Sequence, residues 1–217
     1  MYDPAFDLVF PHNFASVKKG LFLLIVFCTF FHGRMHGQNV LDSLTLSQQK
    51  VFRSLAAAQL QPDSVFRLDL SKKKLKSLPE EIKNFKNLQE LKISRNDLKE
   101  LPEWIGDLQN LTSLDASNNE LAALPPEIGK LKNLVFLGLN RNIIESLPHE
   151  IGMLSKLEII EMWDNELDSI PDEMKNLHSL RVFELRGILF TESAQRQIEE
   201  LLPDTQIYFS PSCNCGD

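Results

Sequence analysis

The chain repeats itself every 23 residues through its central part. An apolar-Pro pair recurs at this interval without insertions, at Leu78-Pro79, Leu101-Pro102, Leu124-Pro125, Leu147-Pro148 and Ile170-Pro171. An asparagine recurs at the same interval, and apolar residues precede it at fixed offsets, so that one unit reads LxxLxLxxNxLxxLPxxIxxL. A repeat of this size buries its apolar side only against its neighbours. The period therefore predicts a linear stack of similar units.

Each unit contains a segment suited to a short strand, because x-L-x-L-x alternates apolar and polar residues. We expect six strands, centred near residues 69, 92, 115, 138, 161 and 184 and paired in parallel. The proline of each pair is expected in the first turn of a short helix or 3-10 segment on the opposite side. Behind it, one apolar residue of each unit should enter the core: Ile82, Ile105, Ile128, Ile151 and Met174.

The repeated asparagines are expected to support the turns after the strands. An amide side chain carries two donors and an acceptor, so it can satisfy backbone groups of its own loop and of the adjoining unit. The predicted structural ladder consists of Asn96, Asn119, Asn142 and Asn165.

The pattern resembles the leucine-rich repeat family in its 23-residue form, similar to Ras-suppressor and Scribble-type proteins and to many bacterial proteins. The resemblance covers about residues 65–209 and departs at the edges, where Lys73 and Ile188 replace the asparagine. It implies an α/β fold: a right-handed solenoid with a curved parallel sheet on the concave face and short helices or 3-10 turns on the convex face. Such solenoids typically bind partners on the concave face.

Both ends of the repeat array are expected to be capped. We divide the chain into a leader (1–37), an N-terminal capping helix and linker (38–64), the repeats (65–190), a C-terminal cap (191–209) and a tail (210–217). Apolar residues at helical spacing predict one amphipathic helix between Leu44 and Leu60. Thr191 is expected to cap a helix that reaches Leu202, and residues 206–209 are expected to form a short edge strand.

The N-terminal region has the composition of an export signal. Lys18 and Lys19 precede an uncharged apolar run from Leu21 to Phe31, which is too short to span a membrane. We expect cleavage after Gly37 and export to the periplasm, the cell surface or the medium. The alternative is a buried N-terminal helix in a cytoplasmic scaffold or signalling adaptor.

The charge and the absence of known motifs argue against several classes of function. The formal net charge is −7, which argues against a general nucleic-acid binder. Residues 65–99 carry ten Lys and Arg against five Asp and Glu, whereas residues 100–217 carry eight against twenty-one. No phosphate-binding glycine loop or G-x-S-x-G motif occurs, and the cysteines lack zinc-finger spacing.

We accordingly expect a non-enzymatic protein with no catalytic residue, metal or cofactor. His149 and His178 are expected on the exposed convex side, and the role of Cys213 and Cys215 stays open. The disfavoured alternative is a thiol-dependent or hydrolytic enzyme, because no acid, base and nucleophile converge on one face.

The alternation places the outward-facing side chains in columns across the strands. They are polar in the first three strands and partly apolar in the last three, at Phe136, Ile159, Trp163 and Val182. An apolar patch with an aromatic anchor and a charged rim has the composition of a binding hot spot. The predicted binding residues are Phe136, Asn140, Arg141, Ile159, Glu161, Trp163, Asp164, Val182, Glu184 and Arg186. The alternative is lateral packing on the sheet, with Arg186 stacked on Trp163.

The predicted function is therefore recognition of another protein or peptide. The sequence does not identify this partner. We expect no nucleic-acid partner, no integral membrane span and a monomeric state.

Overall fold

A computed structural model describes residues 40–211, which belong to two compact units, residues 1–48 and 49–217. The described part of the first unit contains the short helix α2 (Ser43–Gln48). Its first turn is capped by Asp42, whose Oδ1 accepts a hydrogen bond from the backbone N–H of Thr45 at 2.9 Å. The predicted leader, residues 1–37, lies outside the described residues, as do Cys213 and Cys215.

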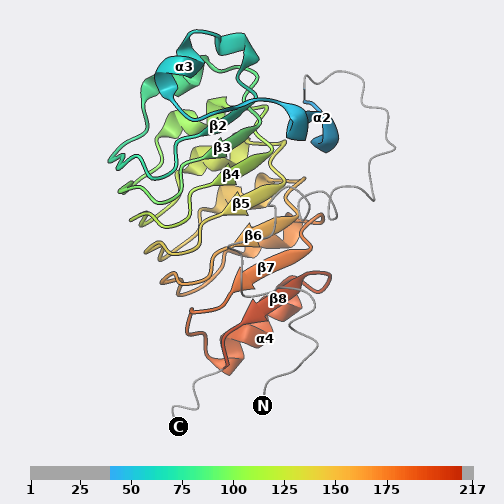
Figure 1. Ribbon diagram of the computed structural model, residues 1–217. Coiled ribbons are helices and arrows are strands. Elements are labelled where there is room, and N and C mark those ends of the chain that lie inside the picture. Colours follow the sequence, from blue (N-terminus) through green and yellow to red (C-terminus); the bar gives the residue numbers. More distant parts are fainter. Residues whose placement is uncertain (1–39, 212–217) are drawn as a thin grey trace, which may run out of the picture. The chain divides into compact units, whose positions relative to one another are not determined.

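The second unit contains one parallel sheet, in which the described strands follow one another in chain order from β1 to β8 (Figure 1). Successive strands pair at the repeat interval, so that Leu114, Leu137 and Ile160 stand side by side. All three are fully buried. The strands are β1 (Val51–Phe52), β2 (Arg67–Asp69), β3 (Glu90–Lys92), β4 (Ser113–Asp115), β5 (Phe136–Gly138), β6 (Ile159–Glu161), β7 (Val182–Leu185) and β8 (Gln206–Phe209).

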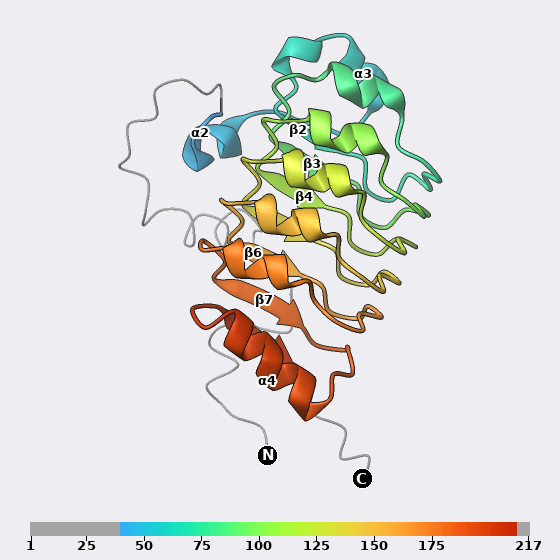
Figure 2. The same cartoon turned by 180° about the vertical axis from the view of Figure 1, so that it is seen from behind.

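Short 3-10 segments stack behind the sheet, as Figure 2 shows from the opposite side. The apolar residues predicted to enter the core from these segments do so, with 0% exposure at Ile82, Ile105, Ile128, Ile151 and Met174. The segments are η2 (Glu80–Asn84), η3 (Glu103–Asp107), η4 (Pro126–Lys130), η5 (His149–Met153) and η6 (Asp172–Asn176); η1 (Pro62–Ser64) precedes β2.

The repeated prolines lie one position earlier than predicted. Pro102 is not in the first turn of η3 but is its N-cap, with an extended backbone at φ −69° and ψ 151°. Its carbonyl accepts the first hydrogen bond of the segment, from the N–H of Ile105 at 2.9 Å. Proline suits this place because the role requires its carbonyl oxygen and leaves its missing N–H without consequence.

The prediction of a single helix from Leu44 to Leu60 is wrong. The chain forms α2, then the strand β1, and then the short helix α3 (Leu55–Gln59). Val51 and Phe52 pair with Arg67 and Leu68, and Phe52 is 2% exposed. β-branched and aromatic residues favour strands. Pairing with the open edge of β2 and burying Phe52 outweigh the helical periodicity of the sequence.

The predicted C-terminal elements are confirmed. Thr191 is the N-cap of α4 (Glu192–Leu201), and its side chain accepts a hydrogen bond from the N–H of Ala194 at 3.2 Å. The edge strand β8 pairs with β7. Ile188, which replaces the repeated asparagine, is 3% exposed and belongs to the core.

The repeated asparagines connect neighbouring units through their side chains. Asn142 Nδ2 donates to the carbonyls of Leu139 at 2.7 Å and Ala116 at 3.2 Å, and its Oδ1 accepts from the N–H of Leu121 at 3.0 Å. Asn165 repeats these contacts one unit further along. Each amide therefore holds its own turn and the preceding unit together.

Candidate functional site

The sheet face turned away from the core, here named the concave face, carries the predicted binding residues on β5 to β7 and on the turns that follow them. The strand pairing confirms the predicted columns: Phe136 pairs with Ile159 and then Val182, and Gly138 pairs with Glu161 and then Glu184. The four apolar members of the patch are all partly exposed: Phe136, Ile159, Trp163 and Val182. Asn140 and Glu184 are buried, which makes them the least accessible of the predicted residues.

A left-handed backbone turn follows each repeat strand and positions the rim of the concave face. Arg141 and Asp164 occupy this place in consecutive units, with φ of 56° and 55°. Arg141 Nε lies 3.5 Å from Asp164 Oδ2. In the last unit Gly187 takes the same place with φ 81°. The two charged residues therefore pair with each other at the exposed edge of the patch.

Trp163 is stacked by a different arginine from the one named in the alternative of lateral packing. The guanidinium carbon of Arg141 lies 4.6 Å from the centroid of the Trp163 ring. Arg186 instead binds Glu184 through two nitrogens, each 2.7 Å from a carboxylate oxygen, and lies 5.9 Å from the centroid of the Tyr208 ring. A two-point bond between guanidinium and carboxylate is stronger than stacking at an exposed site. Arg186 therefore stays with Glu184 on its own strand.

Gly138 lets the ring of Phe136 lean across the middle of the concave face. A Cβ atom on residue 138 would lie only 3.1 Å from Cε1 and 3.2 Å from Cζ of Phe136. The same atom would lie 3.5 Å from Oδ1 of Asp115 on the preceding strand. The ring edge therefore takes the space that a side chain at position 138 would fill, beside Asp115.

Glu161 is a strongly perturbed carboxyl group on this face. Burial, together with the negative charges of Asp115 and Glu184, raises its pKa from 4.5 to about 7. Asp115 accepts hydrogen bonds from the backbone N–H and the hydroxyl of Ser117. Within residues 40–211, neither Asp115 nor Glu161 has a cationic side chain at ion-pair distance.

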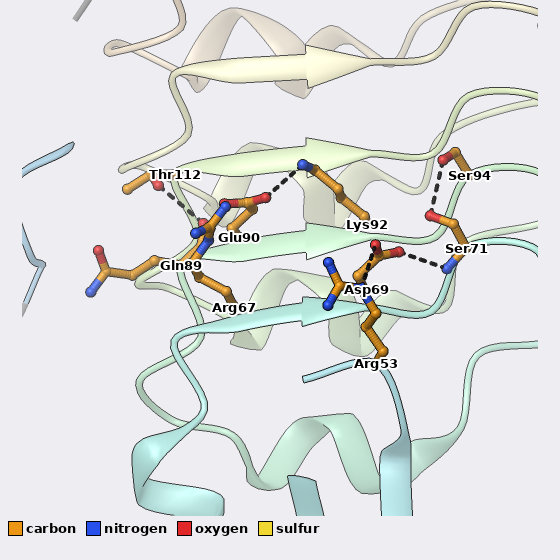
Figure 3. Close-up of polar contacts among 9 residues, drawn as sticks. All are labelled: Arg53, Arg67, Asp69, Ser71, Gln89, Glu90, Lys92, Ser94 and Thr112. Carbon is orange, nitrogen blue, oxygen red and sulfur yellow. Dashed lines mark hydrogen bonds and ion pairs between the residues drawn. The ribbon is translucent and has the colours of Figure 1, made fainter. Parts of the chain in front are cut away.

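The N-terminal half of the same face pairs its own charges (Figure 3). Glu90 contacts Arg67 Nε at 2.6 Å and Lys92 Nζ at 2.8 Å. These opposite charges lower the pKa of Glu90, although its burial acts in the other direction and is the largest single effect. Asp69 lies 4.0 Å from Arg53, which belongs to the segment after β1. The polar strands β2 and β3 are thus a self-paired surface.

Two models of sequence families match the chain. One describes a leucine-rich repeat region and matches residues 94–205, just over half of the chain; the other describes a leucine rich repeat and matches residues 63–121. The chain belongs to the leucine-rich repeat family. No curated protein matches it.

Solved structures of other leucine-rich repeat proteins resemble this one. A leucine-rich repeat protein of Leptospira interrogans is 34% identical with a TM-score of 0.62, over 76% of this chain and 49% of that one. The plant peptide hormone receptor RGFR1, in complex with RGF2, is 32% identical with a TM-score of 0.58, over 68% of this chain and 25% of that one. This leucine-rich repeat protein thus spans about half the length of the first neighbour and a quarter of the second.

Away from the concave face, the described part of this leucine-rich repeat protein has few side chains suited to catalysis or metal binding. His149 and His178 are exposed, as predicted. Glu173 Oε2 accepts a hydrogen bond from Nδ1 of His149 at 2.7 Å, and this bond raises the pKa of His149. In the described range, no three His, Cys, Asp or Glu side chains are arranged to hold a metal ion. The helices between residues 40 and 211 include none with the length and apolarity of a membrane span.

The raised pKa of Glu161 predicts a pH-dependent stability. A carboxyl group that binds its proton more tightly in the folded state stabilises the fold below its unfolded pKa of about 4.5, and this contribution is lost as the pH rises to about 7. Glutamine does not ionise, so the stability of Glu161→Gln should not fall between pH 4 and pH 8 through this position. We expect equal free energies of unfolding for the variant and wild type at pH 4, and a variant more stable by about 1–3 kcal/mol at pH 8. Urea titrations at both pH values measure the difference, and a variant less stable at pH 8 contradicts it.

Proposed function

We propose that this leucine-rich repeat protein is an exported, non-enzymatic recognition module that binds another protein or peptide on its concave face. The observation that carries the proposal is the row of partly exposed apolar side chains on β5 to β7. Phe136, Ile159 and Val182 stand in one column, and Trp163 lies beyond them in the segment that follows β6. Contiguous apolar groups on a protein surface mark sites of interaction.

The arrangement of charges around the patch supports a binding surface. Arg141 and Asp164 form the rim next to Trp163, and Arg186 and Glu184 pair beside Val182. An aromatic anchor surrounded by polar groups that exclude water is the usual composition of an interaction hot spot. Arg141 also stacks on the Trp163 ring, and this contact favours the observed orientation of the anchor.

The fold supports the same class of partner. A stack of repeats offers an extended sheet face, and leucine-rich repeat proteins commonly use such a face for protein binding. The plant receptor that resembles this chain is in complex with RGF2. The absence of enzymatic activity is proposed on the sequence, which lacks a catalytic motif.

Trp163→Ala tests the binding function. Truncating a central aromatic anchor commonly costs about 2 kcal/mol of binding, which is roughly a thirtyfold loss of affinity. Because the ring lies outside the core, we expect the free energy of unfolding to fall by less than about 1 kcal/mol, mostly through the lost stacking with Arg141. Affinity is measured for a partner captured from the native host and then purified.

Ser94→Ala is the control, because Ser94 lies beyond β3 in the self-paired half of the face, where its hydroxyl contacts that of Ser71. The control should bind like wild type. A folded Trp163→Ala variant with unchanged affinity would move the interface away from this patch.

Export is the second part of the proposal and rests on the apolar run after Lys18 and Lys19. Protein isolated from the native host should begin near Gln38 and fractionate outside the cytoplasm. Intact protein that begins at Met1 and stays in the cytosol contradicts export and favours the scaffold alternative.

A further inference from the structure

The carboxylates of the concave face fall into two groups. Glu90 and Asp69 in the N-terminal half each face a cation from a neighbouring strand or segment. Lys92 pairs in register with Asp115, but its Nζ is bound to Glu90. Among residues 40–211, neither Asp115 nor Glu161, which share a column of the sheet, has a cation at ion-pair distance. This leaves two acidic groups without a cationic partner within the described chain.

Phe136 lies between these two groups. Asp115 ends β4 and Glu161 ends β6, so that only β5, with Gly138 in the column, separates them. Strands are about 4.8 Å apart, which places the two backbone positions about 10 Å from each other. The ring edge of Phe136 occupies the space above Gly138. A partly exposed aromatic ring thus has a carboxylate on each side.

A cation over an aromatic ring and between two carboxylates gains from both interactions. The cations near these two groups are already engaged elsewhere: Lys92 with Glu90, Arg141 with Asp164 and Trp163, and Arg186 with Glu184. If one of these side chains moved to Asp115 and Glu161, its present ion pair would break. A cationic side chain of a binding partner can pair with Asp115 and Glu161 without breaking any of these ion pairs.

We propose that the occupant of the concave face is an extended peptide segment that places a lysine or arginine side chain over Phe136, between Asp115 and Glu161. This inference rests on the proposed function and names the chemistry of its partner. Charge complementarity points the same way, because residues 100–217 carry eight Lys and Arg against twenty-one Asp and Glu. The apolar column of Ile159 and Val182 and the ring of Trp163 then contact the neighbouring residues of the same peptide.

The proposal also predicts how binding depends on pH. The groups that face Glu161 from the neighbouring strands are Asp115, Glu184 with its partner Arg186, and Tyr208 beyond them; Arg141 and Asp164 form the rim. Because the pKa of Glu161 is about 7, its carboxylate is only half formed at neutral pH. A cationic peptide should therefore bind more tightly as the pH rises from 6 to 8.

Selection from a library of random peptides displayed on phage, with the full chain as bait, tests the proposal. Peptides selected on wild type should share a lysine or arginine, and Glu161→Gln should weaken a synthetic copy of a selected peptide at pH 8 by about tenfold or more. Glu161→Gln is expected to be more stable than wild type at this pH, so unfolding does not explain the loss. Glu200→Gln on α4 removes the same charge from an exposed position and should leave affinity unchanged.

The outcomes separate the two proposals. Peptides that depend on Trp163 but lack a shared basic residue, or that bind Glu161→Gln as well as wild type, overturn the cationic occupant and leave the proposed binding face standing. If Glu200→Gln loses as much affinity for the peptide as Glu161→Gln, the acidic surface attracts the peptide in general. That result also overturns the cationic occupant. Selection that finds no peptide dependent on Trp163 overturns both proposals.

Discussion

Replacing Leu137 by alanine should lower the free energy of unfolding by about 2–5 kcal/mol. Leu137 lies on β5 in the middle of the stack, is fully buried, and pairs on either side with Leu114 and Ile160. Neighbouring units cannot close the cavity without shifting the strands on both sides, because a parallel sheet fixes their spacing. Denaturant titration of the variant measures the loss.

Ile143→Ala is the matched control for Leu137→Ala. Ile143 follows Asn142 in the same unit but is 46% exposed, so its truncation removes far less buried apolar area. We expect a change below about 1 kcal/mol. Similar losses for the two variants would contradict the assignment of Leu137 to the core face.

Asn142→Ala should cost about 3 kcal/mol, a large effect for a polar residue. Its side chain satisfies the carbonyls of Leu139 and Ala116 and the N–H of Leu121, and it is only 6% exposed. Alanine leaves these buried backbone groups without their partner, at about 1–3 kcal/mol for each group that water cannot reach. The loss should appear in the unfolding midpoint of the whole array, because the bonds connect two units.

Asn176→Ala controls for the loss of an amide. Asn176 ends η6, is exposed, and makes no side-chain hydrogen bond within residues 40–211. Its replacement should change the free energy of unfolding by no more than about 0.5 kcal/mol. If Asn142→Ala proves equally harmless, the asparagines do not hold the units together.

The repeat array was predictable because one period determines strand, turn and core positions together. Shifting the alternation of Leu137 and Leu139 by one residue would turn both outward, so the apolar pattern leaves a single pairing register. The observed pairing of Phe136 with Ile159 and of Gly138 with Glu161 follows from it. The N-terminal end of the array was harder to predict, because β1 lies outside the repeat and pairs with β2. Its two residues also fit a helical pattern.

A column of glycines on the convex side carries a signal that the repeat pattern obscured. Gly106, Gly129 and Gly152 hold equivalent places in η3 to η5. A Cβ atom on Gly106 would lie 2.5 Å from the carbonyl oxygen of Glu127, and one on Gly129 would lie 2.6 Å from that of Glu150. Neighbouring 3-10 segments approach each other closely there. The consensus treats this position as variable because lysine replaces the glycine in the first and last units.

The candidate site was predicted as a set of columns but not as a set of contacts. Column positions follow from the backbone, whereas the pairing of Arg141 with Trp163 and of Arg186 with Glu184 depends on side-chain conformations. The raised pKa of Glu161 could likewise not be predicted from the sequence. Its pKa depends on burial beside Asp115 and Glu184, which the sequence places in the column without indicating their exposure.

Hydrogen–deuterium exchange of the protein with and without its bound partner tests the central claim most directly. If the concave face is the binding surface, protection should concentrate in peptides that cover β5 to β7 and the turns after them, with little change in η3 to η6. Protection confined to the 3-10 segments, with β5 to β7 exchanging as in the free protein, would contradict the claim and assign binding to the convex side.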